Sequence, residues 1–174
     1  KVVEYALNHY GRLDVLDNNI GIASNLSVVE ESEEYWERVM EINLKPMFLM
    51  SKYAIPAMIS SGDAGSIVNI SSISATRPKG LTAYSTSKGA VLSLTQAMAV
   101  DHGSDGIRVN CILPGPVYTP MVYASSSYLN QEEMSSEQRS QRQNASLLQI
   151  EGEGWDIGKA VVYLSSNWAR YITG

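Results

Sequence analysis

The chain has 174 residues, of which 44% are hydrophobic and 18% are charged. This composition is typical of a globular domain and excludes collagen-like, coiled-coil and disordered classes. The net charge of −5 argues against nucleic acid or an anionic membrane as a partner. A membrane-spanning helix needs about 18 consecutive apolar residues, and no run in the sequence approaches that length. The single cysteine, Cys111, excludes an internal disulfide and favours a reducing compartment such as the cytoplasm. No histidines or cysteines have the spacing of metal ligands, so we expect no metal site.

The sequence begins and ends within predicted secondary-structure elements that would extend beyond it. The residues after Lys1 have the character of the middle of a helix, and residues 171–174 lie where a strand should begin. We therefore expect the chain to be a piece of a longer protein.

Short apolar runs alternate with segments of helical periodicity along the chain. Strands are predicted at residues 13–17, 65–72 and 106–113, of which the last two are expected to be buried on both faces. Helices are predicted from Ser32 toward Ile59, over residues 84–102 and over residues 156–166. Ser32 precedes two glutamates, a pattern typical of a helix N-terminus. This order predicts one α/β domain over residues 1–174, with a partial doubly wound parallel sheet between two helical layers.

A polar stretch over residues 124–145 separates the last predicted strand from the last helix. It could be a disordered linker, since its composition alone allows that. In doubly wound folds, however, ligands bind at the edge of the sheet where such a segment begins. We therefore favour a substrate lid over residues 120–150.

Tyr84 and Lys88 are four residues apart on the predicted helix, which places their side chains on one face. A nearby positive charge favours the phenolate and is expected to lower the pKa of the tyrosine, which suits it to general acid–base work. Such a pair also arises by chance on surface helices. Its neighbourhood strengthens the case, because Ser71 and Ser72 end the preceding buried strand and can bind a substrate oxygen. Alternatively, the serines only cap the turn.

Asn43 lies three residues before Pro46 in the first long helix. Proline has no N–H, so we expect a kink there, with a freed backbone acceptor that could bind water or be merely structural. Two loops with glycine, at residues 18–21 and 114–120, follow predicted strands. Because the carboxyl ends of parallel strands meet at one edge, we expect all these features to converge on one crevice.

Together these motifs resemble the short-chain dehydrogenase/reductase family, which has a single Rossmann domain. The turn Asn18-Asn19-Ile20-Gly21 is similar to the family's Asn-Asn-Ala-Gly, and the segment from Tyr84 to Lys88 is similar to its Tyr-x-x-x-Lys. Asn43, the strand ending in Ser71-Ser72 and the segment Val109 to Gly115 match three further motifs in the family's order.

The resemblance implies an NAD- or NADP-dependent oxidoreductase that interconverts an alcohol and a carbonyl of a small molecule. Tyr84 would donate or accept the proton, and Lys88 would hold the nicotinamide ribose and lower the tyrosine pKa. Ser72 would steady the substrate oxygen, and Asn43 would hold a relay water through its backbone carbonyl. The family also implies a homo-oligomer, a dimer or tetramer, with the helices at Ser32 and Tyr84 in the interface.

The resemblance also implies which residues meet the cofactor. Asn18 and Gly21 would line its adenosine side. Its nicotinamide end would meet Pro114, Gly115, Val117 and Thr119. Three departures from the family pattern bear on the site: Ile20 adds bulk where the cofactor passes, Asp17 places a carboxylate in an apolar strand, and the interval from Ser72 to Tyr84 is one residue short. Counted from Ser71, the interval matches the family's. Alternation along the strand puts the two hydroxyls on opposite faces, and the resemblance implies that Ser72, the second serine of the pair, faces Tyr84, with Ser71 turned toward the fold.

No Gly-x-x-x-Gly-x-Gly turn occurs in the sequence. In the family this turn binds the cofactor's pyrophosphate at a helix N-terminus. We therefore expect the chain by itself to bind NAD(H) or NADP(H) weakly and to be inactive. Two alternatives remain: a truncated, non-catalytic isoform that acts only through subunit pairing, and a related epimerase or dehydratase, whose substrate domain is usually larger.

Overall fold

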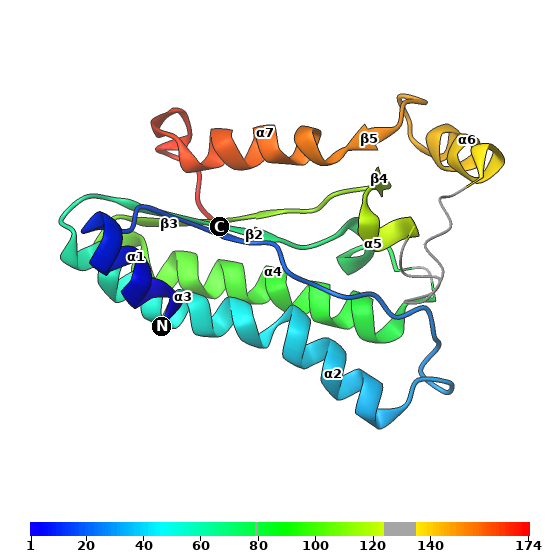
Figure 1. Ribbon diagram of the computed structural model, residues 1–174, viewed down its shortest axis with the longest axis horizontal. Coiled ribbons are helices and arrows are strands. Elements are labelled where there is room, and N and C mark those ends of the chain that lie inside the picture. The colour runs from blue at the N-terminus through cyan, green and yellow to red at the C-terminus, as the bar shows by residue number, and fades with distance from the viewer. Residues whose placement is uncertain (79, 124–134) are drawn as a thin grey trace.

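Three parallel strands form the sheet at the centre of the molecule (Figure 1). In this computed structural model, which describes residues 1–78, 80–123 and 135–174, the strands are β1 (Val15–Asn18), β2 (Gly65–Ile70) and β3 (Ile107–Ile112). They lie in the order β1-β2-β3. Every residue of β2 is buried, as predicted, whereas β3 is buried only in part because Arg108, Cys111 and Ile112 are half-buried.

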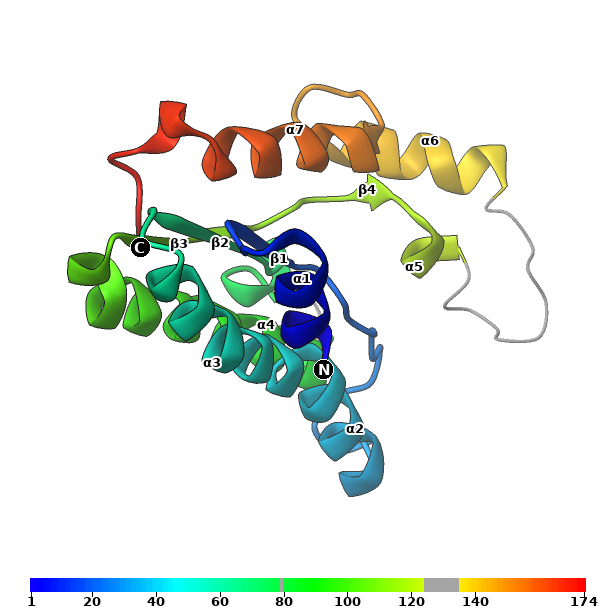
Figure 2. The same cartoon turned by 60° about the vertical axis from the view of Figure 1, so that its left-hand side comes forward.

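Helices cover both faces of the sheet (Figures 1 and 2). On one face lie α1 (Val2–Tyr10), α3 (Lys45–Ser60) and α4 (Thr82–His102), with α2 (Glu33–Asn43) extending beyond the sheet. On the other face lies α7 (Gly154–Ser165). The predicted three-layer α/β/α architecture is therefore confirmed.

The hydrophobic core lies between the sheet and the layer of α3 and α4. Its largest fully buried side chains include Met58 of α3, Ile67 of β2 and Ile107 of β3, each at most 1% exposed. Burying an aliphatic side chain of this size contributes about 1.5–3 kcal/mol to folding. The core thereby fixes α4 against the carboxyl ends of the strands, where the predicted crevice lies.

The segment from Ser32 to Ile59 forms two helices, not the single kinked helix predicted from the sequence. Its start is as expected, because the Ser32 side chain accepts a hydrogen bond from the backbone N–H of Tyr35. The helix ends at Asn43, and α3 begins at Lys45 after Leu44. Pro46 lies in the first turn of α3, where its missing N–H costs least.

The chain that follows β3 crosses to the α7 side of the sheet. It forms β4 (Val117–Tyr118) and α5 (Pro120–Tyr123), and β4 pairs in parallel with β5 (Gly152–Glu153) just before α7. Part of the predicted lid is the helix α6 (Ser136–Ala145), which begins with a capping box between Ser135 and Gln138. Residues 124–134 of that lid, and Lys79, lie outside the described residues.

The last residues lie beside β3. The backbone N–H of Gly174 donates to the carbonyl of Val109, whose own N–H donates to the Thr173 hydroxyl. Three single turns of 3₁₀-helix complete the described structure: η1 (Ile73–Ala75), η2 (Gly103–Asp105) and η3 (Asn167–Ala169). None of the helices in the described part of the chain is both long enough and apolar enough to cross a bilayer.

Candidate active site

A cavity of about 560 Å³ lies at the carboxyl ends of the strands, between α4 and α7. Seven of the predicted site residues line it: Ser72, Tyr84, Lys88, Pro114, Gly115, Val117 and Thr119. The other three, Asn18, Gly21 and Asn43, do not line it and lie deeper or to one side. The structure therefore brings the predicted proton donor, amine and serine together with the loop after β3.

Tyr84 lies in the first turn of α4, where its half-buried ring borders the cavity. Ser72 ends the segment after β2, and its side chain lies close enough to the Tyr84 phenol to affect its pKa. The Ser72 hydroxyl also accepts a hydrogen bond from the N–H of Ser74, at 3.1 Å, and so caps η1. One serine thus holds the turn and faces the tyrosine.

Ser71 points the other way, into the fold. Its hydroxyl donates to the backbone carbonyl of Lys88 at 2.7 Å, while Lys88 Nζ donates to the carbonyl of Ile70 at 2.8 Å. These two hydrogen bonds clamp α4 to the end of β2 from both sides. The orientation expected for the two serines is therefore what the structure shows, whereas their roles in a reaction stay predictions.

The Lys88 side chain is buried, with 2% of the residue exposed, and its Nζ lies 5.8 Å from the centre of the Tyr84 ring. Burial lowers the pKa of Lys88 to about 8, and the neighbouring Cys111 acts in the opposite direction. The amine is therefore charged over most of the neutral range, but at an energetic cost.

The expected lowering of the Tyr84 pKa is not found. Burial raises the pKa of Tyr84 above its usual value, and the hydrogen bond from Ser72 only partly offsets this. Desolvation disfavours the charged phenolate more than the hydrogen bond favours it. The phenol is therefore protonated at neutral pH, which is the form that a general acid needs.

Asn43 is fully buried and is committed to local structure. Its amide donates to the carbonyl of Ile22 and to the Ser87 hydroxyl, and its Oδ1 accepts from the N–H of Ile22 at 2.7 Å. It therefore joins the end of α2 to α4 and to the loop after β1. The relay-water role of its backbone carbonyl stays a prediction.

Gly21 lies in that same loop, packed against the amide of Asn43 and the amine of Lys88. A Cβ at this position would lie 3.2 Å from Asn43 Oδ1 and 3.4 Å from Lys88 Nζ. The absence of a side chain at Gly21 thus allows a close approach, as expected of a glycine. The groups that approach it are side chains of the protein itself, Asn43 and Lys88.

Asn18 faces the interior of the sheet and not the cavity. Its side chain donates to Asn69 Oδ1 at 2.9 Å, Asn69 donates in turn to the Thr95 hydroxyl, and Thr95 donates to the carbonyl of Val91. This buried chain of hydrogen bonds joins β1, β2 and α4. The expected place of Asn18 beside the adenosine side of the cofactor stays a prediction.

The structure places two of the departures from the family pattern. Asp17, although it lies in an apolar strand, is exposed and lines the cavity, where partial desolvation raises its pKa. Its side chain alternates with the buried Leu16 and Asn18 along β1, so it lies on the α7 side of the sheet. Ile20 is 73% exposed, so its bulk lies at the surface.

The α7 side of the cavity was missed by the sequence analysis. Arg142 of α6 lines it, together with Met121 and residues of α7: Gly154, Trp155, Ile157, Gly158, Val161 and Val162. Helical periodicity at the end of the chain predicts α7 but not what it faces. That follows from the pairing of β4 with β5, two strands of two residues each, which periodicity cannot detect. Within residues 1–78, 80–123 and 135–174, no group of three or more acidic, histidine or cysteine side chains is placed to hold a metal ion.

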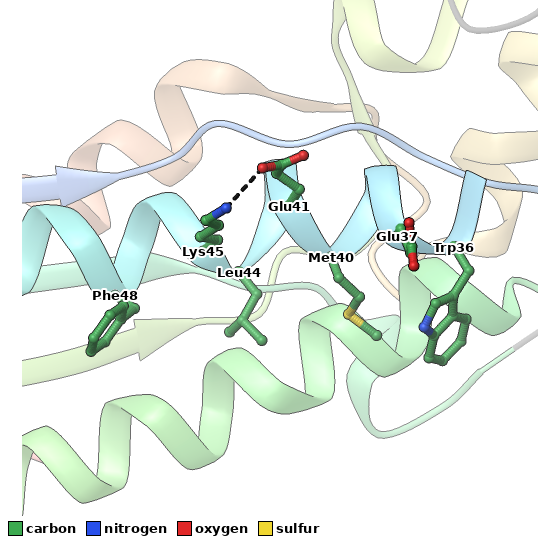
Figure 3. A pocket seen from close by; sticks show the side chains of 7 residues that line it. All are labelled: Trp36, Glu37, Met40, Glu41, Leu44, Lys45 and Phe48. Atoms are coloured by element: carbon green, nitrogen blue, oxygen red, sulfur yellow. Dashed lines mark hydrogen bonds and ion pairs between the residues drawn. The ribbon is translucent and has the colours of Figure 1, made fainter. Parts of the chain in front are cut away.

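A second surface lies on α2 and α3, away from this cavity. Trp36, Met40, Leu44 and Phe48 recur every four residues and point to one side, away from the ion pair of Glu41 and Lys45 (Figure 3). We call these four residues the α2–α3 strip. Trp36, Met40 and Leu44 are half-buried and Phe48 is 48% exposed, so the strip presents apolar surface to solvent.

Comparison with known proteins agrees with this geometry. A family model described as "Enoyl-(Acyl carrier protein) reductase" matches residues 1–174. The short chain dehydrogenase/reductase astE of Aspergillus oryzae is 35% identical over 167 residues, which are 95% of this chain and 62% of that protein. The 3-oxoacyl-(acyl-carrier-protein) reductase FabG of Thermotoga maritima is 33% identical, over 100% of this chain and 67% of its own.

A solved structure gives the same result. The ligand-free aldohexose dehydrogenase of Thermoplasma acidophilum superposes with a TM-score of 0.90 at 33% identity, covering 99% of this chain and 68% of its own. The chain thus spans about two thirds of the length of the relatives that it matches. The matches extend from one end of the chain to the other, and the chain belongs to the short-chain dehydrogenase/reductase family of oxidoreductases.

Proposed function

We propose that the full-length protein is an NAD- or NADP-dependent oxidoreductase that interconverts an alcohol and a carbonyl, with Tyr84 as the general acid/base. The observation that carries this is the convergence of the Tyr84 phenol, the Ser72 hydroxyl and the Lys88 amine at one cavity. The names of the relatives, a dehydrogenase/reductase, a reductase and a dehydrogenase, support it.

The residues present fit the nicotinamide end of such a cofactor. Lys88 offers an amine beside the tyrosine, and the loop of Pro114, Gly115, Val117 and Thr119 lines the same cavity. A bound nicotinamide cofactor would supply or accept the hydride. Because the chain carries no glycine-rich phosphate turn, the chain itself would contribute little to binding the pyrophosphate.

The chain's own residues would handle the oxygen and its proton. In the reducing direction, the protonated Tyr84 would donate its proton to the carbonyl oxygen as negative charge develops there. Ser72 would donate a hydrogen bond to the same oxygen, which stabilises that charge. The charged Lys88, 5.8 Å from the ring centre, would stabilise the phenolate that remains.

Replacing the phenol tests this function. In the full-length protein, Tyr84→Phe should reduce turnover by about 10²–10⁴-fold while leaving the fold intact, because only the transferable proton is lost. Turnover is measured by the absorbance of NADH and NADPH with a panel of alcohols and ketones, and the fold by circular dichroism. Tyr5→Phe, which removes an exposed phenol from α1, is the matched control and should not change turnover.

Two results would count against the proposal. A Tyr84→Phe variant with nearly full turnover would show that another group moves the proton. Wild-type protein that oxidises or reduces no member of the panel with either cofactor would favour the alternative, a non-catalytic isoform.

We also propose that the protein forms a homo-oligomer through α2, α3 and α4. The α2–α3 strip supports this, since exposed apolar side chains at a spacing of four residues suit helix–helix packing (Figure 3). Replacing Phe48, the most exposed member, by Glu should shift the protein to monomer in analytical ultracentrifugation. A Phe48→Glu protein with unchanged mass in solution would place the interface elsewhere.

A further inference from the structure

Among the described residues that line the cavity, Arg142 is a cation with a single long hydrogen bond to the rest of the protein. Among the described residues that line the cavity, only Asp17, Lys88 and Arg142 carry a formal charge, and most of the others are apolar. Lys88 is buried and bonded to the carbonyl of Ile70. Arg142, on α6, is half-buried and borders the same space.

A second arginine on the same helix, Arg139, has its guanidinium engaged by neighbouring side chains. Arg139, one turn before Arg142, binds the carboxylate of Glu151 through Nε and Nη2 and stacks over the Tyr118 ring at 4.3 Å. It therefore ties α6 to the segment before β5 and to β4. Arg139 is not among the described residues that line the cavity.

Arg142 has no comparable partner among the described residues. Its Nη2 donates to the carbonyl of Val117 at 3.5 Å, which is a long hydrogen bond. A guanidinium has five N–H donors in a planar fork, so most of them are available to a ligand. The nearby carboxylate of Glu151 is bound by Arg139, and Arg142 interacts with it only at longer range, through its charge. No ion pair within 4 Å joins Glu151 to Arg142 in the part of the chain described.

The ligand that best satisfies such a group is an anion with two oxygens. Arginine binds carboxylates and related oxyanions through two parallel, charge-assisted hydrogen bonds. The apolar side chains of Met121, Trp155, Ile157 and Val161 lie along the same cavity, and Val117, whose carbonyl Arg142 contacts, belongs to the loop that lines it near Tyr84.

We propose that Arg142 binds an anionic group of the substrate, so that the site selects alcohols and ketones that also carry a carboxylate or a similar oxyanion. This rests on the proposed oxidoreductase function. The apolar side chains of α7 would pack along the carbon chain between the anion and the reacting carbon, while Tyr84 and Ser72 bind the oxygen at that carbon.

Paired substrates that differ only in charge test the proposal. The full-length protein is assayed with 4-oxopentanoate, 5-oxohexanoate and 6-oxoheptanoate and with the methyl ester of each. The wild type should show a higher kcat/KM for at least one acid than for its ester. Arg142→Gln should reduce that kcat/KM by about tenfold or more, mainly through KM, and leave the ester within about twofold, because a charge-assisted hydrogen bond is lost only with the acid. Arg142→Lys should retain an intermediate preference.

Arg139→Gln is the matched control on the same helix. It removes a positive charge from α6 but not from the cavity wall, so it should change kcat/KM for acid and ester by the same factor. The proposal is overturned if Arg142→Gln affects acid and ester equally, or if it instead raises the KM for NAD(P)H with both, which would assign the arginine to the cofactor's phosphates. Turnover of the acids and esters taken together reports on the oxidoreductase function, so a wild type that turned over neither would count against the proposed function and not against this selectivity.

Discussion

The two walls of the cavity are built in different ways. The α4 wall consists of α4 and the ends of β1 and β2. Seven residues of α4 are buried, and three of them are polar: Ser87, Lys88 and Thr95. The opposite wall consists of α6 and α7, and neither helix has a buried residue in the described structure. Trp155 and Val162 of α7 are 77% and 69% exposed.

This difference separates two tasks. Polar groups that are buried need hydrogen-bond partners, and the buried side chains Ser87, Lys88 and Thr95 of α4 each bind a residue of another element. Tyr84, Ser72 and Lys88 are held in such a network. Contacts on the α6–α7 wall are exposed and individually weak, which suits a surface that adapts to the shape of a substrate. In the proposed reaction, the geometry of the proton transfer is thereby kept independent of substrate selection.

The largest change in turnover that would test this difference between the walls is expected on substitution of the two serines. In the full-length protein, Ser72→Ala should reduce kcat by about 10²-fold, since it removes a hydrogen bond to the oxygen on which charge develops. Ser71→Ala should retain most of the turnover but lower the free energy of unfolding by about 1 kcal/mol, because it removes one bond of the clamp on Lys88. Steady-state kinetics and urea unfolding measure the two. If Ser71→Ala lost more turnover than Ser72→Ala, the assignment of the two hydroxyls would be reversed.

A smaller effect is expected in the free energy of unfolding, which should fall more when a polar contact on the α4 side is removed than when one on the α6–α7 wall is removed. Asn69→Ala should lower the free energy of unfolding by about 1–3 kcal/mol, because it leaves the amide of Asn18 buried without an acceptor. Arg139→Gln, which breaks an ion pair whose arginine is 45% exposed, should cost about 1 kcal/mol or less. Urea unfolding of both variants makes the comparison. Equal losses would mean that the α6–α7 wall is as tightly held as the α4 wall.

The smallest effect concerns the buried amine. The pKa of Lys88 is about 8 in the folded chain and near 10.5 when unfolded. Between these values the unfolded state binds more protons, so this residue makes the free energy of unfolding rise as the pH is raised from about 8 toward 10. Lys88→Met should remove that rise, whereas Lys159→Met, at an exposed lysine of α7, should retain it. Urea unfolding at pH 7 and pH 9 detects it, and parallel pH dependence in wild type and Lys88→Met would contradict a charged amine at a costly site.

Much of the α4 wall could be predicted from the sequence. The spacing of Tyr84 and Lys88, and the ending of an apolar run at Ser71 and Ser72, are local patterns that follow from helix and strand geometry. The side chain of Asn18 could not be placed in this way. Its partner Asn69 is 51 residues away, and the register that sets them opposite each other is a property of the folded sheet.

The direction of the Tyr84 pKa was wrong for a related reason. Sequence spacing shows that Lys88 is near, but it does not show how much water the fold removes from the phenol. Burial proved the larger influence. Arg142 was missed because α6 is polar throughout, so no apolar periodicity marks the face that borders the cavity.

Gly21 limits how this protein can change over time. Any larger residue there would place its first carbon against Asn43 Oδ1 and Lys88 Nζ at once, at 3.2 and 3.4 Å. Those two side chains are themselves committed, one to Ile22 and Ser87 and the other to Ile70. A substitution at position 21 would therefore require Asn43 to shift by a few tenths of an ångström, whereas the contact with the end of Lys88 is close to an ordinary one. An evolving or redesigned lineage that changed this glycine would disturb the link that Asn43 makes between the loop after β1 and α4.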